Sequence, residues 1–131
     1  MFYTVKELVE QSHAFSSVAE LMVHTEVENS TRTEAQIRHL MSRNLEVMER
    51  SVKEGIAGVK SVTGLTGGEA KKLNHYIAAD RFMSGKPIME AVRNAVAVNE
   101  VNAKMGLICA TPTAGSAGVL AGVLLAMRDR L

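Results

Sequence analysis

Two stretches rich in glycine and hydroxyl side chains each stand directly before a segment with helical spacing of apolar residues. They are "TGLTGG", residues 63–68, and "TPTAGSAG", residues 111–118. A glycine-rich turn at a helix start exposes backbone N–H groups, and the helix dipole adds positive potential there. Such a start attracts a carboxylate or a phosphate, and glycine lets the ligand approach because no Cβ intervenes. The chemistry indicated is capture of a small anion.

The candidate binding groups in these stretches are backbone amides and hydroxyls. In chain order they belong to Thr66, Gly67, Gly68, Thr111, Thr113, Gly115, Ser116 and Gly118. The second stretch is not a phosphate-binding P-loop, because the Gly-Lys-Ser/Thr ending is absent. The alternative is that each stretch only caps a helix, with glycines that permit a tight helix crossing. Two such stretches in one small domain favour a shared site.

A polar cluster interrupts a later segment that is otherwise lined with Ala and Val. It consists of Asn99, Glu100 and Asn102, which we take as candidate catalytic residues. Asn is unfavourable inside a helix because its amide competes for the backbone, so this cluster indicates a task in a site. The alternative is an exposed ion pair between Glu100 and Lys104, with both Asn side chains in water. The sequence leaves both interpretations open.

Metal-binding and nucleophilic residues are sparse. The four histidines, at positions 13, 24, 39 and 75, show no metal-ligand spacing. Cys109 is the single cysteine, and no histidine close to it in the sequence would activate it. We therefore expect an inert buried thiol, no internal disulfide and no metal site on this chain.

The elements that position these residues are helices, because the apolar periodicity is helical throughout and only two prolines occur. Helices are predicted from about residue 5, over 15–27, from about 33 to Gly55 or Gly58, over 69–81, from Ser84, and from within 113–118 to the end. The expected fold is all-α, with about five to six helices and glycine-rich loops at helix N-termini. We expect residues 1–131 to form one helical domain.

Two helix starts have recognisable capping residues. Thr31 with Glu34, and Thr33 with Gln36, both match the capping-box spacing. Ser84 is the expected N-cap of the fifth helix, with a proline in its first turn. Small residues on one face of that helix (Ala91, Ala95, Ala97 and Ala103) predict close approach of neighbouring backbones.

Composition excludes several classes of protein. The net charge is +1 and aromatic residues make up 4%, with no Trp, so nothing indicates a nucleic-acid or anionic-membrane partner. The longest apolar run, residues 119–127, is far shorter than the roughly 20 residues that span a bilayer. No signal peptide is recognisable at the start, and the free thiol fits a reducing compartment, so we expect a cytoplasmic protein.

The last helix is unusually apolar. A helix such as "GVLAGVLLAM", residues 118–127, normally packs on more than one side. We therefore expect either a partner or a longer protein to cover it, and self-association of the lone chain. A non-catalytic helical interaction module, whose final helix docks on a partner, is one interpretation of the whole chain.

Three segments together resemble a known family. "NEVNAKMGLICATPTAGSAGV", "TGLTGGEAKKL" and the initial "MFYTVKELVE" occur in the same order in the alpha chain of the iron–sulfur-dependent bacterial L-serine dehydratases. The resemblance covers essentially the whole chain. It departs at Ala121, where the family usually has proline, and in length, because this chain resembles only the N-terminal half of the family's alpha chain.

The resemblance implies a helical catalytic domain that converts L-serine to pyruvate and ammonia in the cytoplasm. It implies a [4Fe–4S] cluster held by cysteines of the missing half, together with a beta chain in two-chain members. A cluster iron would polarise the substrate hydroxyl. The two glycine stretches would hold the substrate carboxylate, and Glu100 its ammonium within a network with Asn99 and Asn102.

The same resemblance limits what this chain does alone. Since Cys109 matches none of the family's cluster ligands, we expect no cluster and no dehydratase activity on the lone chain. The catalytic base is not assigned by the sequence. A related lyase that acts on cysteine and releases sulfide is an alternative within the same superfamily.

Overall fold

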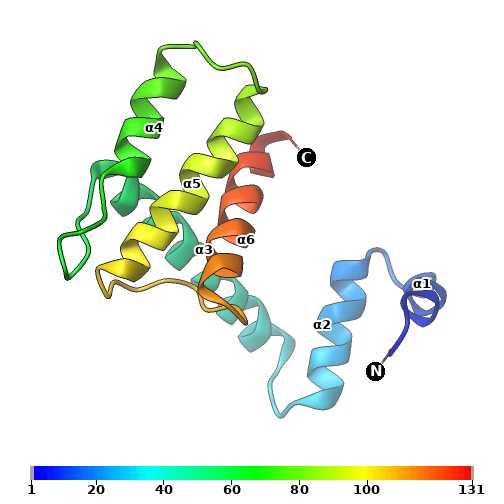
Figure 1. The fold of residues 1–131 in the computed structure, drawn as a ribbon. Helices are drawn as coiled ribbons and strands as arrows, with labels where there is room; N and C mark the ends of the chain where they lie inside the picture. The colour runs from blue at the N-terminus through cyan, green and yellow to red at the C-terminus, as the bar shows by residue number, and fades with distance from the viewer. Residues whose placement is uncertain (1, 131) are drawn as a thin grey trace. The chain divides into compact units, whose positions relative to one another are not determined.

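The structure, a computed structural model, describes residues 2–130 and is all-α (Figure 1). The elements are α1 (Val5–Ser12), α2 (Val18–Asn29), α3 (Glu34–Ala57), α4 (Glu69–Ala78), α5 (Lys86–Ala103), α6 (Ala114–Met127) and a 3₁₀ turn, η1 (Arg128–Arg130). No strand occurs within residues 2–130. The prediction of an all-α fold with five to six helices is confirmed. None of the helices in this part of the chain is both long and apolar enough to cross a bilayer.

The chain divides into two compact units, Met1–Arg43 and Asn44–Leu131, and α3 contributes to both. The single domain expected over residues 1–131 stays a prediction. In the first unit, Arg38 of α3 pairs with Glu20 of α2 at 2.9 Å, with both side chains about half exposed. The one buried apolar residue among α1 and α2 is Leu21, so this unit has little core of its own.

Local capping explains where the helices of the first unit begin. The Thr33 hydroxyl accepts the Gln36 N–H at 3.3 Å, and the Gln36 side chain accepts the Thr33 N–H at 2.9 Å, so this capping box is confirmed. The second helix begins at Val18 and not at Phe15, because the Ser17 hydroxyl accepts the Glu20 N–H at 3.2 Å.

In the second unit, α5 packs against both α4 and α6 (Figure 1). A Cβ added at Gly122 of α6 would lie 2.6 Å from the Ala91 carbonyl oxygen. One added at Gly55 of α3 would lie 2.4 Å from the Ala97 carbonyl oxygen. The predicted close approach at the small face of α5 is therefore confirmed, since only glycine fits at these two crossings.

The core of the second unit is built from short side chains. Its central cluster consists of Met48, Val52, Val98 and Ala121, from α3, α5 and α6. The largest side chains buried below 2% exposure are Val98, Val101 and Ser51. Large apolar side chains therefore contribute little to the deepest part of this core.

Two helix boundaries differ from the prediction and one matches it. Gly85, and not Ser84, is the N-cap of α5, and it supplies no side-chain hydrogen bond. Its carbonyl oxygen accepts the Ile88 N–H at 3.0 Å, and Pro87 stands in the first turn as predicted. The fourth helix ends at Ala78, before Arg81. Gly58, with φ of 101°, follows the last residue of α3 as predicted.

Candidate functional site

The start of α4 is occupied by a carboxylate from α5. Glu100 Oε1 accepts the backbone N–H of Glu69 at 2.6 Å and that of Ala70 at 3.2 Å. The N-cap residue, Gly68, has no side chain that could do this. Glu100 therefore caps α4 from another helix, and the positive end of the helix dipole holds its oxygen.

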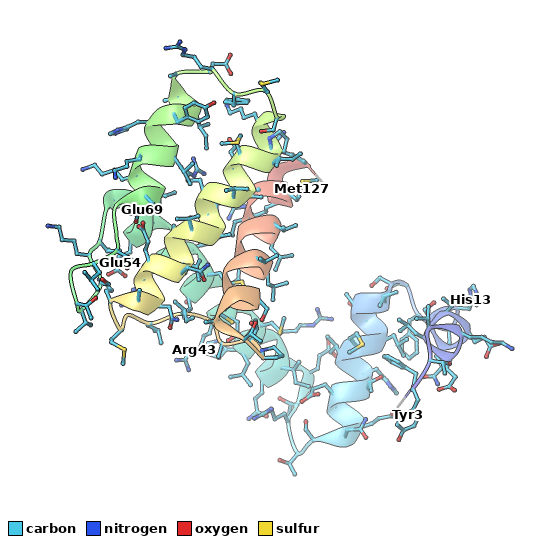
Figure 2. All side chains as sticks on the ribbon, viewed as in Figure 1. Tyr3, His13, Arg43, Glu54, Glu69 and Met127 are labelled. Atoms are coloured by element: carbon cyan, nitrogen blue, oxygen red, sulfur yellow. The ribbon has the colours of Figure 1, made fainter. Side chains whose placement is uncertain are left out.

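The Glu100 side chain is only 7% exposed. The expected alternative, an exposed ion pair with Lys104, is wrong, because Lys104 pairs instead with Glu54 of α3. Figure 2 labels Glu54 and Glu69, which mark the end of the unit where the chain passes from α3 to α4. Burial of Glu100 follows from its position on the α4-facing side of α5.

Glu69 and Glu100 form a pair of carboxyl groups with opposite pKa shifts. Burial raises the pKa of Glu100, and the neighbouring Glu69 raises it further. The Glu100 carboxyl in turn lowers the pKa of Glu69, helped by backbone N–H groups that include Gly67 at 2.9 Å. Within residues 2–130, Glu100 Oε2 is the buried side-chain oxygen without a hydrogen-bond partner. The two shifts have opposite directions, so Glu69 loses its proton at a lower pH than Glu100 does.

The two glycines before α4 are required by the path of the chain. Gly67 has φ of 132° and Gly68 has φ of 90°, which L side chains rarely adopt. A Cβ at Gly67 would lie 2.2 Å from the Val59 carbonyl oxygen. Thr66 closes the same loop, because its N–H donates to Ser61 Oγ at 3.2 Å and its carbonyl accepts the Ser61 N–H at 2.8 Å. These residues have structural tasks that need no ligand.

The start of α6 is capped by its own hydroxyls. Thr113 Oγ1 accepts the Ser116 N–H at 3.1 Å, and Ser116 Oγ accepts the Thr113 N–H at 3.1 Å. The Thr111 hydroxyl lies 2.5 Å from Ser116 Oγ. This is a capping box built from Thr and Ser, and it rigidifies the turn before the helix.

Two backbone donors remain open at the start of α6. Within the part of the chain that the structure describes, no hydrogen bond uses the N–H groups of Ala114 and Gly115. A Cβ added at Gly115 would meet no heavy atom within 4 Å. Gly118 differs, because its Cβ would lie 2.8 Å from the Ala95 carbonyl oxygen, so this glycine serves helix packing.

The polar cluster of α5 lies between the two helix starts. The amide oxygen of Asn99 lies 2.8 Å from where a Gly118 Cβ would stand, whereas Glu100 faces α4. Both helix starts therefore lie near the C-terminal end of α5 (Figure 1). Asn102 is half-buried and its carbonyl accepts the Met105 N–H at 2.9 Å. No hydrogen bond of the described residues joins the 63–68 stretch to the 111–118 stretch, so their shared site stays a prediction.

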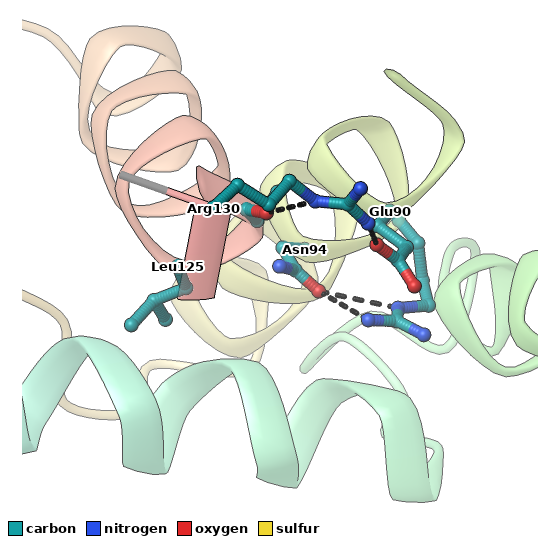
Figure 3. A pocket seen from close by; sticks show the side chains of 6 residues that line it. Glu90, Asn94, Leu125 and Arg130 are labelled. Atoms are coloured by element: carbon teal, nitrogen blue, oxygen red, sulfur yellow. Dashed lines mark hydrogen bonds and ion pairs between the residues drawn. The ribbon is translucent and has the colours of Figure 1, made fainter. Parts of the chain in front are cut away.

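A polar pocket toward the opposite end of α5 was not predicted from the sequence. It has a volume of about 420 Å³ and is lined by Glu90, Arg93, Asn94, Leu125, Ala126 and Arg130 (Figure 3). Arg130 donates to Glu90 at 2.8 Å, and Arg93 donates to the buried Asn94 amide oxygen at 2.9 Å. Burial lowers the pKa of Arg93. The mid-helix Asn94 was an available signal, since it breaks the same Ala/Val pattern as Asn99.

Comparison with known proteins gives the family. A family model described as "Serine dehydratase alpha chain" matches residues 13–131. The chain belongs to the serine dehydratase alpha chain family. The resemblance found in the three sequence segments is thereby confirmed at the level of the family.

Three relatives agree with this assignment. "Probable L-serine dehydratase, alpha chain" of Bacillus subtilis (strain 168) is 49% identical over 132 residues, which are 100% of this chain and 44% of the relative. "L-serine dehydratase, alpha chain" of Peptoniphilus asaccharolyticus is 29% identical over 133 residues, 99% of this chain and 45% of the relative. A Latilactobacillus sakei protein, "Probable L-serine dehydratase, alpha chain", is 64% identical over 44 residues, 34% of this chain and 21% of that protein. No solved structure matches.

The chain spans less than half the length of the two relatives that it matches from end to end. Its own residues do not fit an iron–sulfur cluster of the kind that the resemblance implies. Such a cluster needs several thiolates, whereas Cys109 is the single cysteine and packs half-buried against the core. Among residues 2–130, no three His, Cys, Asp or Glu side chains are grouped so that they could hold a metal ion.

Proposed function

We propose that this chain forms part of an L-serine dehydratase, an L-serine ammonia-lyase that converts L-serine to pyruvate and ammonia. Family membership and the names of the relatives support this activity. The proposed location is the cytoplasm, and the proposed partners are the remaining part of an alpha chain and a beta chain.

The start of α6 is the proposed binding place for the substrate carboxylate. The observation that carries this assignment is the pair of open N–H groups at Ala114 and Gly115. Among the residues that the structure describes, no carboxylate accepts a hydrogen bond from this helix start. Thr111, Thr113 and Ser116 fix the turn so that these donors stay oriented. An amino-acid carboxylate suits unpaired backbone N–H groups at the positive end of a helix.

The polar cluster of α5 is proposed to act around this turn. Asn99 borders the α6 start, and with Asn102 it would contribute polar groups to the site. Glu100 is a positioning residue in this proposal, because its oxygen holds the α4 start and so orders Thr66, Gly67 and Gly68. Binding of the substrate ammonium by Glu100 stays a prediction, since its free oxygen is buried.

The [4Fe–4S] cluster is proposed to be held entirely by residues outside this chain. Its chemistry, polarisation of the serine hydroxyl, would then come from outside as well, and the lone chain is proposed to be inactive. Anaerobic reconstitution of the lone chain with iron and sulfide tests this. Substoichiometric iron and no pyruvate from serine are expected, whereas a stable cluster with turnover would contradict the proposal.

The site itself is tested in an enzyme completed with a full alpha chain and a beta chain. The double variant Thr113→Val, Ser116→Ala should weaken serine turnover while assembly stays intact. A pure interaction module predicts either unchanged turnover or lost assembly. Parallel assays with serine and cysteine, following pyruvate and sulfide, separate a dehydratase from a cysteine-degrading lyase.

A further inference from the structure

The large apolar side chains of α6 are exposed, whereas its small residues are buried. Its buried residues are small, mainly Ala117, Gly118, Ala121 and Gly122. Its outward-facing residues are Val119, Leu120, Val123 and Leu124, which are 44–59% exposed and which we name the outer face of α6. No charged residue occurs in α6, so no charge on the helix offsets the exposure of this apolar face to water.

Close packing of α6 against α5 explains why the buried residues of α6 are small. Glycines 118 and 122 bring α6 so close to α5 that added Cβ atoms would lie 2.8 Å and 2.6 Å from α5 carbonyl oxygens. Such an approach leaves no room for large side chains between the helices. The deepest core of this unit is correspondingly poor in large side chains. The outer face is therefore an apolar layer that requires a cover.

The lengths of the relatives indicate which polypeptide segment could cover the outer face of α6. More than half of each full-length match lies outside the aligned region, since this chain covers 44% and 45% of the two relatives. The alignments contain 132 and 133 positions for 131 residues, so the additional residues flank the matched region and do not interrupt it. No long insertion between these helices is therefore available in the relatives to cover α6.

We propose that the outer face of α6 is the docking surface for the part of the alpha chain that the relatives have beyond the matched region. This flanking part completes the core across Val119, Leu120, Val123 and Leu124. The inference rests on family membership and not on the proposed substrate or reaction. It is therefore testable without any activity measurement.

The experiment compares the 131-residue chain with a chimera in which it replaces the matched region of the Bacillus subtilis relative. The test variant is the double change Leu120→Glu, Leu124→Glu, because Glu keeps helix propensity while it introduces charge. The control is Met83→Glu, at a loop side chain that is fully exposed. The test variant should lower the unfolding temperature of the chimera by at least about 5 °C more than that of the 131-residue chain.

The control should leave both proteins nearly unchanged. Covalent footprinting of residues 119–124 should show several-fold less labelling in the chimera than in the 131-residue chain. Equal temperature shifts in both proteins would overturn the proposal. Protection from labelling that rises with the concentration of the 131-residue chain would show that a second copy covers the outer face of α6. Protection that does not depend on concentration would show that another segment of the same chain covers it. Either result would overturn the proposal.

If the chimera does not fold, footprinting of the intact Bacillus subtilis relative decides the question. Protection of its aligned helix supports the docking surface. Full labelling of that helix overturns it.

Discussion

The starts of α4 and α6 have similar sequences and opposite uses of their backbone amides. At α4, Glu100 of α5 accepts hydrogen bonds from two backbone N–H groups. Only glycine fits at position 67, because a Cβ there would clash with the Val59 backbone. At α6, Thr113 and Ser116 cap each other, and no hydrogen bond among the described residues uses the N–H groups of Ala114 and Gly115. A glycine-rich helix start therefore does not by itself indicate ligand binding. It must also be known whether groups of the protein already accept hydrogen bonds from its backbone N–H groups.

The largest expected loss of stability distinguishes two glycines of the loop before α4, one where an added Cβ would clash and one where it would not. Gly67→Ala should lower the free energy of unfolding by about 2–4 kcal/mol, because its Cβ meets the Val59 backbone and its φ is strained. Gly64→Ala is the matched control, with φ of 73° but no heavy atom within 4 Å of the added Cβ. It should lose about 1–2 kcal/mol from strain alone. Urea unfolding measures both, and equal losses would remove the close approach as an explanation.

The next effect tests the carboxylate cap of α4. Glu100→Ala leaves two amides in a part-buried position without an acceptor and should lower the free energy of unfolding by about 2–3 kcal/mol. Glu100→Gln keeps an acceptor oxygen of the same shape and should retain stability at pH 7. Chemical denaturation of the two variants compares them. A Gln variant as unstable as the Ala variant would show that the negative charge, and not the acceptor, holds α4.

The pH dependence of stability sharpens the same point. Because the pKa of Glu100 is raised on folding, the folded state holds this proton more tightly than the unfolded state. The free energy of unfolding should therefore fall as the pH rises from the ordinary glutamic acid value of 4.5 toward the raised value. Glu100→Gln should flatten this decline. The lowered pKa of Glu69 acts in the other direction and at lower pH, where its contribution is lost as the pH falls below 4.5.

A smaller effect is expected for the self-made cap of α6. Thr113→Val removes one acceptor hydroxyl and should lower the free energy of unfolding by about 1 kcal/mol. Thr113→Ser retains the hydroxyl and should stay within a few tenths of a kcal/mol of the parent, by the general tolerance of N-cap positions for either residue. Thermal unfolding distinguishes the two variants. No difference between them would mean that Ser116 and Thr111 fix the turn without Thr113.

The smallest structural effect belongs to Gly115. Gly115→Ala should leave stability unchanged or raise it by up to about 1 kcal/mol, since the Cβ meets open space and Ala favours a helix. In the completed enzyme the same methyl group should hinder approach of the substrate carboxylate and raise KM for serine. Steady-state kinetics together with thermal unfolding check this. An unchanged KM would argue against a ligand at the α6 start.

The sequence by itself determined the family, the all-α class and most of the local structure. The capping box at Thr33, the turn at Gly58 and the proline in the first turn of α5 depend on residues a few positions apart. Their energies are local, so spacing along the chain is enough to predict them. The apolar character of residues 118–127 is likewise readable from composition alone.

Only the tertiary structure decided which helix start is filled and which face of α6 is buried. Glu100 and Glu69 are 31 positions apart, so no local spacing relates the carboxylate to the amides that it caps. The pocket around Arg93 and Asn94 likewise needs residues from α5 to η1. Burial, and with it the raised pKa of Glu100, depends on how α4, α5 and α6 pack, because desolvation is a property of the surroundings and not of the residue.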